Sequence, residues 1–143
     1  MSTFRQIDNE IIFVHKDQLI TLFNKVILDE NNSFTLPQLI RNLNVQYQAW
    51  AYFAGDTEND LEAIILTTVA PEDSDIVVRI IGFATGGSDP LNVAEIFGFL
   101  NDMAAGFGAA FIEVKTPEPA PVFWGNNGFT TPNLFLRKPV TTP

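Results

Sequence analysis

The sequence predicts an α+β (α/β) domain built on a mixed sheet, and three observations lead to this prediction. The apolar residues follow a helical period in the first third of the chain, a strand-like period from about residue 45 to 84, and a helical period again after Pro90. Short polar turns separate the strand-like segments, as in an antiparallel meander. The last helical segment runs directly into another apolar run, which predicts a βαβ unit with parallel strands.

The first third of the chain predicts one strand and two N-terminal helices. The apolar run Ile11–Val14 is expected to be the first strand, and residues 16–28 are expected to form a helix with one apolar face. A second helix is expected to begin at Thr35, because Thr35 and Gln38 fit a capping box and Pro37 suits a first helical turn.

The middle of the chain predicts the meander, with strands at residues 45–54, 61–69 and 76–84. The turn at residues 55–60 is acidic, but it lacks the rest of a calcium loop and is expected to be a turn only. The second turn covers residues 71–75.

The clearest predicted element is the helix after Pro90, because apolar residues from Val93 to Phe107 recur on one face. Ser88 or Asp89 is expected to cap it. Strands are expected at 110–114 and 134–138, the second following an irregular stretch. We expect one domain over residues 1–143, with a frayed tail at 139–143.

Composition narrows the classes of function. The formal net charge is −9, which disfavours nucleic acid and anionic membranes as partners. There is no cysteine and only one histidine, His15, so a thiolate or histidine metal site is not expected. His15 is expected at the surface. The polar N-terminus shows no signal-peptide pattern, so the expected location is cytoplasmic. The 13 phenylalanines favour a deep core or a buried interface, hence a protein partner or self-association.

The order of these elements, together with the segment 118–129, resembles the GNAT N-acetyltransferase superfamily over nearly the whole chain. In that segment Ala120, Gly128 and Phe129 fall in register with the family ending N-x-x-A-x-x-x-Y-x-x-x-G-F. The resemblance implies an acyl-CoA donor, held by a Gly-rich loop at the start of the long helix and by a gap between the strands that flank this helix. It also implies that a small divergent member is sometimes a phage virion component.

The Gly-rich pattern occurs twice in altered form. Residues 79–84 spell R-x-x-G-x-A, but they are expected to lie within a strand, with Arg79 in solvent and Gly82 at a bulge. The loop that precedes the long helix is Thr85, Gly86, Gly87 and Ser88, which are the candidate residues for binding acetyl-CoA. Asp89 follows this loop and competes with an anionic ligand.

The catalytic groups implied by the resemblance are sparse. Trp124 stands where the family places a tyrosine acid, and indole does not donate a proton usefully. Glu62 and Glu113 are the candidates for a general base, although each also fits an outward-facing strand carboxylate. Two functions therefore stay open: a non-catalytic binding or assembly protein without cofactor, and an acyl-CoA-dependent N-acetyltransferase acting on a cationic amine.

Overall fold

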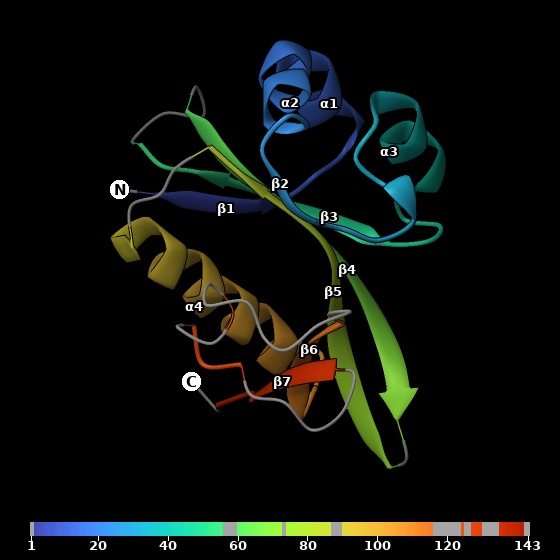
Figure 1. The fold of residues 1–143 in the computed structure, drawn as a ribbon, viewed down its shortest axis with the longest axis vertical. Coiled ribbons are helices and arrows are strands. Elements are labelled where there is room, and N and C mark those ends of the chain that lie inside the picture. The colour runs from blue at the N-terminus through green and yellow to red at the C-terminus, as the bar shows by residue number, and fades with distance from the viewer. Residues whose placement is uncertain are drawn as a thin grey trace. The chain divides into compact units, whose positions relative to one another are not determined.

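The computed structural model describes residues 2–55, 60–72, 74–86, 90–115, 124, 127–129 and 135–141. Its elements, in chain order, are β1 (Thr3–Gln6), α1 (Asn9–Val14), α2 (Lys16–Leu22), β2 (Val26–Asp29), the 3₁₀ turn η1 (Glu30–Asn32), α3 (Leu36–Asn42), β3 (Gln48–Phe53), β4 (Leu61–Glu72), β5 (Asp75–Thr85), α4 (Pro90–Gly106), β6 (Phe111–Lys115) and β7 (Phe135–Pro139). Figure 1 shows them as a ribbon. The structure confirms the predicted α+β class with a mixed sheet.

The strands form a seven-stranded mixed sheet in the order β1-β3-β4-β5-β6-β7, and β2 pairs with β5 outside this order. The chain divides into two compact units. The first contains Met1–Thr68 and Ile81–Val93, and the second contains Val69–Ile80 and Ala94–Pro143. A single domain over the whole chain stays a prediction.

The first helix begins where a strand was expected. The Asp8 carboxylate accepts a hydrogen bond from the Ile11 backbone N–H at 2.9 Å, which caps α1. Ile11 and Ile12 then face the core, while Phe13 is 85% exposed. The prediction of a strand at Ile11–Val14 is therefore wrong, because a four-residue apolar run alone does not distinguish a strand from a helix. The first strand is β1, which pairs antiparallel with β3.

The second helix is shorter than its apolar pattern predicts. It ends at Leu22, and Val26–Asp29 continue as strand β2 instead of the predicted helix to residue 28. The partner strand supplies the reason, because β2 satisfies backbone groups of β5. Helix α3 begins as predicted, since the Thr35 hydroxyl accepts the Gln38 N–H at 3.3 Å and Pro37 lies in the first turn.

The core of the first unit lies between its helices and one face of its strands (Figure 1). The residues of this core are almost completely buried. They include Ile11, Leu19, Leu22, Phe34, Leu39, Ala49, Ala51, Phe53, Ile64, Leu66 and Ala84. Alternate residues of β3 and β4 point to this face, as the period of strands requires. This packing places α1, α2 and α3 against the meander.

Strand β5 changes partner along its length. At Val77–Ile80 it pairs in parallel with Phe111–Val114 of β6, which confirms the predicted βαβ unit. At Gly82, Phe83 and Ala84 it pairs antiparallel with β2. The R-x-x-G-x-A pattern therefore lies within β5, as expected.

The second unit packs α4 beside β6 and β7, which are antiparallel to each other. Phe97 of α4, Trp124 and Phe129 meet edge to face, with ring centroids 5.4–6.0 Å apart. Phe107 is 42% exposed rather than on the inner face, because α4 ends at Gly106. The predicted caps Ser88 and Asp89 lie outside the described residues. None of the described helices is long and apolar enough to cross a membrane.

The end of the chain is hydrogen bonded as far as Thr141, within the second unit. The Val140 N–H donates to the Ala110 carbonyl at 2.9 Å. Asn101 of α4 donates to the Thr141 carbonyl at 3.0 Å and accepts from its N–H at 3.0 Å. Residues 139–141 of the expected frayed tail are thus tied to β6 and α4.

We predict that Gly82→Ala destabilises the protein by about 1–3 kcal/mol, because a Cβ at this position has no room. It would lie 2.5 Å from a ring carbon of Phe34 and 2.9 Å from a methyl of Leu66. Close approach, not the expected bulge, therefore explains this glycine. Urea unfolding measures the effect. Gly98→Ala is the matched control, because nothing lies within 4 Å of its Cβ position. A Gly82→Ala protein as stable as wild type would contradict the packing described here.

Candidate functional site

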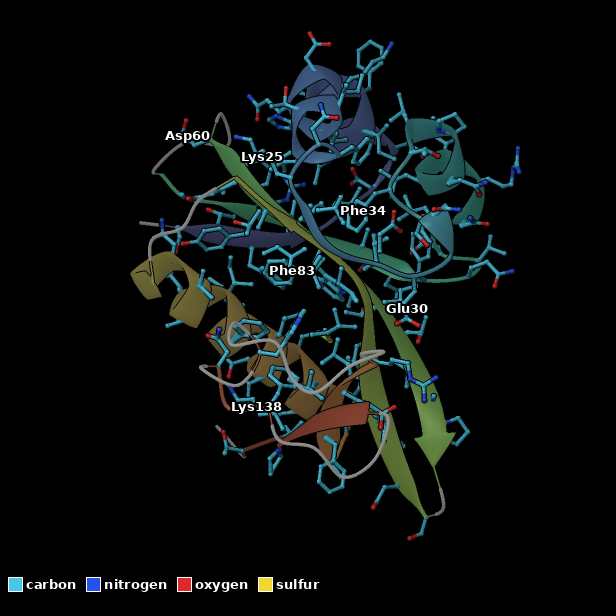
Figure 2. The ribbon with its side chains drawn as sticks, viewed as in Figure 1. Lys25, Glu30, Phe34, Asp60, Phe83 and Lys138 are labelled. Atoms are coloured by element: carbon cyan, nitrogen blue, oxygen red, sulfur yellow. The ribbon has the colours of Figure 1, made fainter. Side chains whose placement is uncertain are left out.

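The candidate site is a pocket of about 430 Å³ in the first unit. Its walls come from the end of α2, the start of β4 and the end of β5, and the lining residues are Gln18, Thr21, Leu22, Lys25, Ala54, Asp60, Leu61, Glu62 and Gly86. Figure 2 labels Lys25 and Asp60 in this region. Two of the predicted site residues, Glu62 and Gly86, thus line one pocket.

Strand β4 bulges at Glu62, one of the residues that line the pocket. Tyr52 of β3 lies opposite Ala63, and the next residue, Phe53, lies opposite Leu61. Glu62 is therefore the extra residue of a β-bulge, a feature that re-aims a side chain and is common beside active sites. The expectation of an ordinary outward-facing strand carboxylate does not describe it.

A short relay of hydrogen bonds orients the Glu62 carboxylate. The Asn92 side-chain amide, in the first turn of α4, lies 3.2 and 3.4 Å from the two carboxylate oxygens and donates to them. The Tyr52 hydroxyl in turn donates to the Asn92 amide oxygen at 3.3 Å. Because Tyr52 is buried, its hydroxyl is a well-positioned hydrogen-bond donor to the Asn92 amide. Two residues, Tyr52 of β3 and Asn92 of α4, thereby position the Glu62 carboxylate of β4.

The predicted donor-binding loop is partly described. Thr85 ends β5, and its N–H donates to the Lys25 carbonyl at 3.3 Å. The Gly86 N–H donates to the Glu62 carbonyl at 2.8 Å, so this N–H belongs to the β4–β5 pairing. Gly87 and Ser88, also predicted to bind acetyl-CoA, lie outside the described residues, as does Asp89.

The sequence gives no cation near this loop, but the fold brings one. The Lys25 ammonium lies 3.6 Å from the position that a Cβ on Gly86 would take. It follows α2 in the chain and is far from Gly86 in sequence, so only the tertiary structure reveals it. A cation beside an exposed glycine is a local arrangement that suits an anionic group.

Glu113, the other candidate base, is committed to an ion pair. Its carboxylate is fully buried in the second unit and accepts from Arg79 Nε at 2.9 Å and from Arg79 Nη2 at 2.8 Å. The two residues are opposite each other on β5 and β6. The expectation that Glu113 faces solvent is therefore wrong, whereas the Arg79 side chain stays 32% exposed, and the pairing explains how a carboxylate is tolerated in the sheet.

Trp124, which the resemblance places at the family's tyrosine acid, is 1% exposed. Its ring packs against Phe97 and Phe129, so the structure places it in the aromatic core of the second unit. His15 is also buried rather than at the surface, with its ring 5.1 Å from that of Phe53.

In the expected acidic turn, residues 56–59 lie outside the described part of the chain.

The backbone edge of β5 past Ile80 is covered. Strand β4 runs along one edge, since Glu62 of β4 bonds Gly86. The other edge is used by β6 up to Ile80 and by β2 at Gly82–Ala84. The resemblance implies an opening for the donor beside this strand, but strand β2 occupies that edge. Within the described ranges, no three His, Asp or Glu side chains gather as a metal site.

We predict that Arg79→Met lowers the free energy of unfolding by about 3 kcal/mol, because it leaves the buried Glu113 carboxylate without its ion-pair partner. This is the low end of the usual cost, since the Arg79 side chain is 32% exposed. The double variant R79M/E113L should recover most of the loss in a urea titration. If the double variant were as unstable as Arg79→Met, the unpaired Glu113 carboxylate would not be the cause of the lost stability.

Comparisons with known proteins were made on sequence and on structure. No protein-family model matches the sequence, and no curated protein is significantly similar to it. Solved structures do match. The ribosomal-protein-S18-alanine N-acetyltransferase of Escherichia coli superposes with a TM-score of 0.68 at 11% identity, over 100% of this chain and 96% of that one. A GNAT family acetyltransferase of Staphylococcus aureus gives 0.69 at 13% identity, over 92% and 93%.

A third match is N-acetylglutamate synthase from Neisseria gonorrhoeae in complex with coenzyme A and N-acetyl-glutamate, with a TM-score of 0.68 and 12% identity. It covers 99% of this chain but 36% of the synthase chain. Identities this low establish the fold and not the activity. On fold, the matches agree with the resemblance of the sequence, and the chain is a divergent protein with the GNAT acetyltransferase fold.

Proposed function

We propose that the chain is an acyl-CoA-dependent N-acyltransferase that uses Glu62 to take the proton of an amine. The observation that carries this proposal is the bulge at Glu62, a residue that lines a pocket together with Lys25 and Gly86 and whose carboxylate is held by Asn92. The fold of the neighbours favours acyl transfer over a purely non-catalytic role. The R-x-x-G-x-A pattern has no part in the proposal, because it lies inside β5.

The pocket has groups for both reactants. Lys25 beside Gly86 suits an anionic group of a ligand. Asp60 and Glu62 suit a positively charged amine, and their charge would raise its local concentration. The substrate class is therefore an acyl-CoA thioester together with a cationic amine.

The reaction needs one proton acceptor from the protein and no acid from Trp124. The amine nitrogen attacks the thioester carbonyl carbon, so a C–N bond forms and the C–S bond breaks. Glu62 takes one proton from the ammonium before the attack, which frees the lone pair of the nitrogen, and water takes the second proton that the nitrogen loses as the amide forms. The sulfur leaves with the electron pair as a thiolate, and water protonates it, since a thiol has a pKa of about 8.5. Asn92 and Tyr52 act as positioning residues, because they hold the carboxylate without touching the reactants.

A second function, protein binding without catalysis, is favoured by two observations. The covered edge of β5 lies where a donor would be expected, and α1 ends in an exposed apolar pair, Phe13 and Val14, which are 85% and 63% exposed. In this alternative Phe13 would contact a protein partner or a second copy.

We predict that acetyl-CoA raises the thermal midpoint of the wild-type protein. At about 100 times its dissociation constant it should add roughly 2.7 kcal/mol of stability. Lys25→Glu should abolish most of the rise, since it reverses the charge beside Gly86. Lys16→Glu is the control, because it makes the same charge change on an exposed residue of the same unit that does not line the pocket. No rise for wild type, with sedimentation showing self-association, would instead support the second function.

We predict that Glu62→Gln lowers the rate of acetyl transfer by about 10²–10⁴-fold, while acetyl-CoA still raises the thermal midpoint. Release of the coenzyme A thiol with a series of cationic primary amines measures the rate, and the chain adds no background because it has no cysteine. Glu10→Gln, on an exposed residue of α1, is the matched control. An unchanged rate in Glu62→Gln would remove the proposed role of this carboxylate.

A further inference from the structure

We infer that β2 is a removable occupant of the β5 edge, which the acyl donor must displace before it binds. This inference rests on the proposed function and adds a regulatory device to it. In the free chain, residues 26–29 pair with the edge of β5 that the donor would use. When the donor binds, it replaces these residues at that edge.

The pairing of β2 is short and irregular. It contributes three register pairs, Val26↔Ala84, Leu28↔Phe83 and Asp29↔Gly82, and Ile27 has no partner because the register shifts there. A bulge leaves one residue unpaired and disrupts the ladder locally. The segment is thus attached by fewer backbone bonds than its neighbours, since β3 and β4 share six register pairs.

The side chains of β2 bury little. Its burial alternates between intermediate and exposed, none of its four residues is buried, and Ile27 is 41% exposed. By contrast, Gly82, Phe83 and Ala84 on the partner strand are all buried. Removing β2 would therefore expose a preformed strand edge and would cost the core cluster of the first unit its contact with Val26.

The connections on both sides of β2 allow it to move as a unit. Before it, residues 23–25 leave α2 as a turn, and after it the Asp29 carboxylate accepts the Ser33 N–H within the turn that contains η1. The residues of the first connection are not fully buried, whereas the second ends at Ser33 and Phe34, which are buried and would act as the fixed end of the movement. A segment between two short turns can swing out without unfolding a helix.

Lys25 couples this movement to the pocket. It directly precedes β2, its carbonyl accepts the Thr85 N–H, and its ammonium lies beside Gly86. An anion that draws the ammonium toward the loop would pull on the adjacent end of β2. The edge that β2 releases offers backbone donors and acceptors, which an extended ligand with amide groups can use in the manner of an added strand. The pantetheine arm of an acyl-CoA carries two such amides.

The experiment locks β2 to β5 with a disulfide, and the lack of other cysteines makes the cross-link specific. Val26→Cys and Ala84→Cys are direct register partners, and strand partners lie within the Cα separation that a disulfide spans. The thermal midpoint is measured with and without acetyl-CoA, on the oxidised and the reduced double variant. Arg5→Cys with Ala51→Cys, partners on β1 and β3, is the control cross-link.

We expect acetyl-CoA to raise the midpoint of wild type, of the reduced β2 variant and of both forms of the control, but not of the oxidised β2 variant. An equal rise in the oxidised β2 variant would overturn the inference and leave the proposed function intact. If wild type shows no rise, the proposed function fails, and the exchange of β2 fails with it.

Hydrogen exchange supplies a test that needs no cross-link. We expect acetyl-CoA to speed the exchange of the backbone amides in residues 26–29, while those of Gly82–Ala84 stay protected by the ligand. Slower or unchanged exchange in residues 26–29, under conditions where acetyl-CoA raises the midpoint, would mean that β2 remains paired and would refute the displacement.

Discussion

The hydrogen-bonding edges of β5 are the constraint on which the rest of the structure depends. A central strand has backbone groups on both sides, and each buried group needs a partner. Strand β4 satisfies one side, whereas the other side is divided between β6, which pairs up to Ile80, and β2, which pairs from Gly82. The close approach of Phe34 and Leu66 to Gly82 then requires a residue without a side chain at the point where the partners change.

This division explains the largest difference between sequence and structure. Residues 16–28 carry a continuous helical pattern, yet the helix ends at Leu22. Local propensity is a weak preference that tertiary pairing overrides, and here the unpaired edge of β5 is the tertiary factor. The pairing lies about 55 residues away in sequence, so no local pattern could have indicated it. The same applies to Lys25, whose position beside Gly86 follows from β2.

Other parts of the fold were predictable because their signals are local. The Thr35 cap, the meander, the long helix after Pro90 and the parallel strand after it each follow from spacing within about 20 residues. For the site, the sequence proposed Glu62 and Glu113 as alternative bases and placed Trp124, a poor proton donor, at the acid position. Burial separates them, since Glu113 and Trp124 are enclosed and Glu62 lines a pocket. The bulge that distinguishes Glu62 arises from the register of β3 and β4, which the sequence does not state.

These outcomes concentrate the remaining chemistry in one unit. Glu62, Asn92, Tyr52, Lys25 and Gly86 all belong to the first unit, whereas the candidates that became core belong to the second. Burying Glu113 against Arg79 removes a carboxylate from water, and packing Trp124 against two phenylalanines places its ring in the core. Under the proposed function, acyl transfer would depend on the accurate placement of one carboxylate and on water to protonate the leaving sulfur. That dependence favours a well-supported Glu62, which is what its relay from Asn92 and Tyr52 supplies.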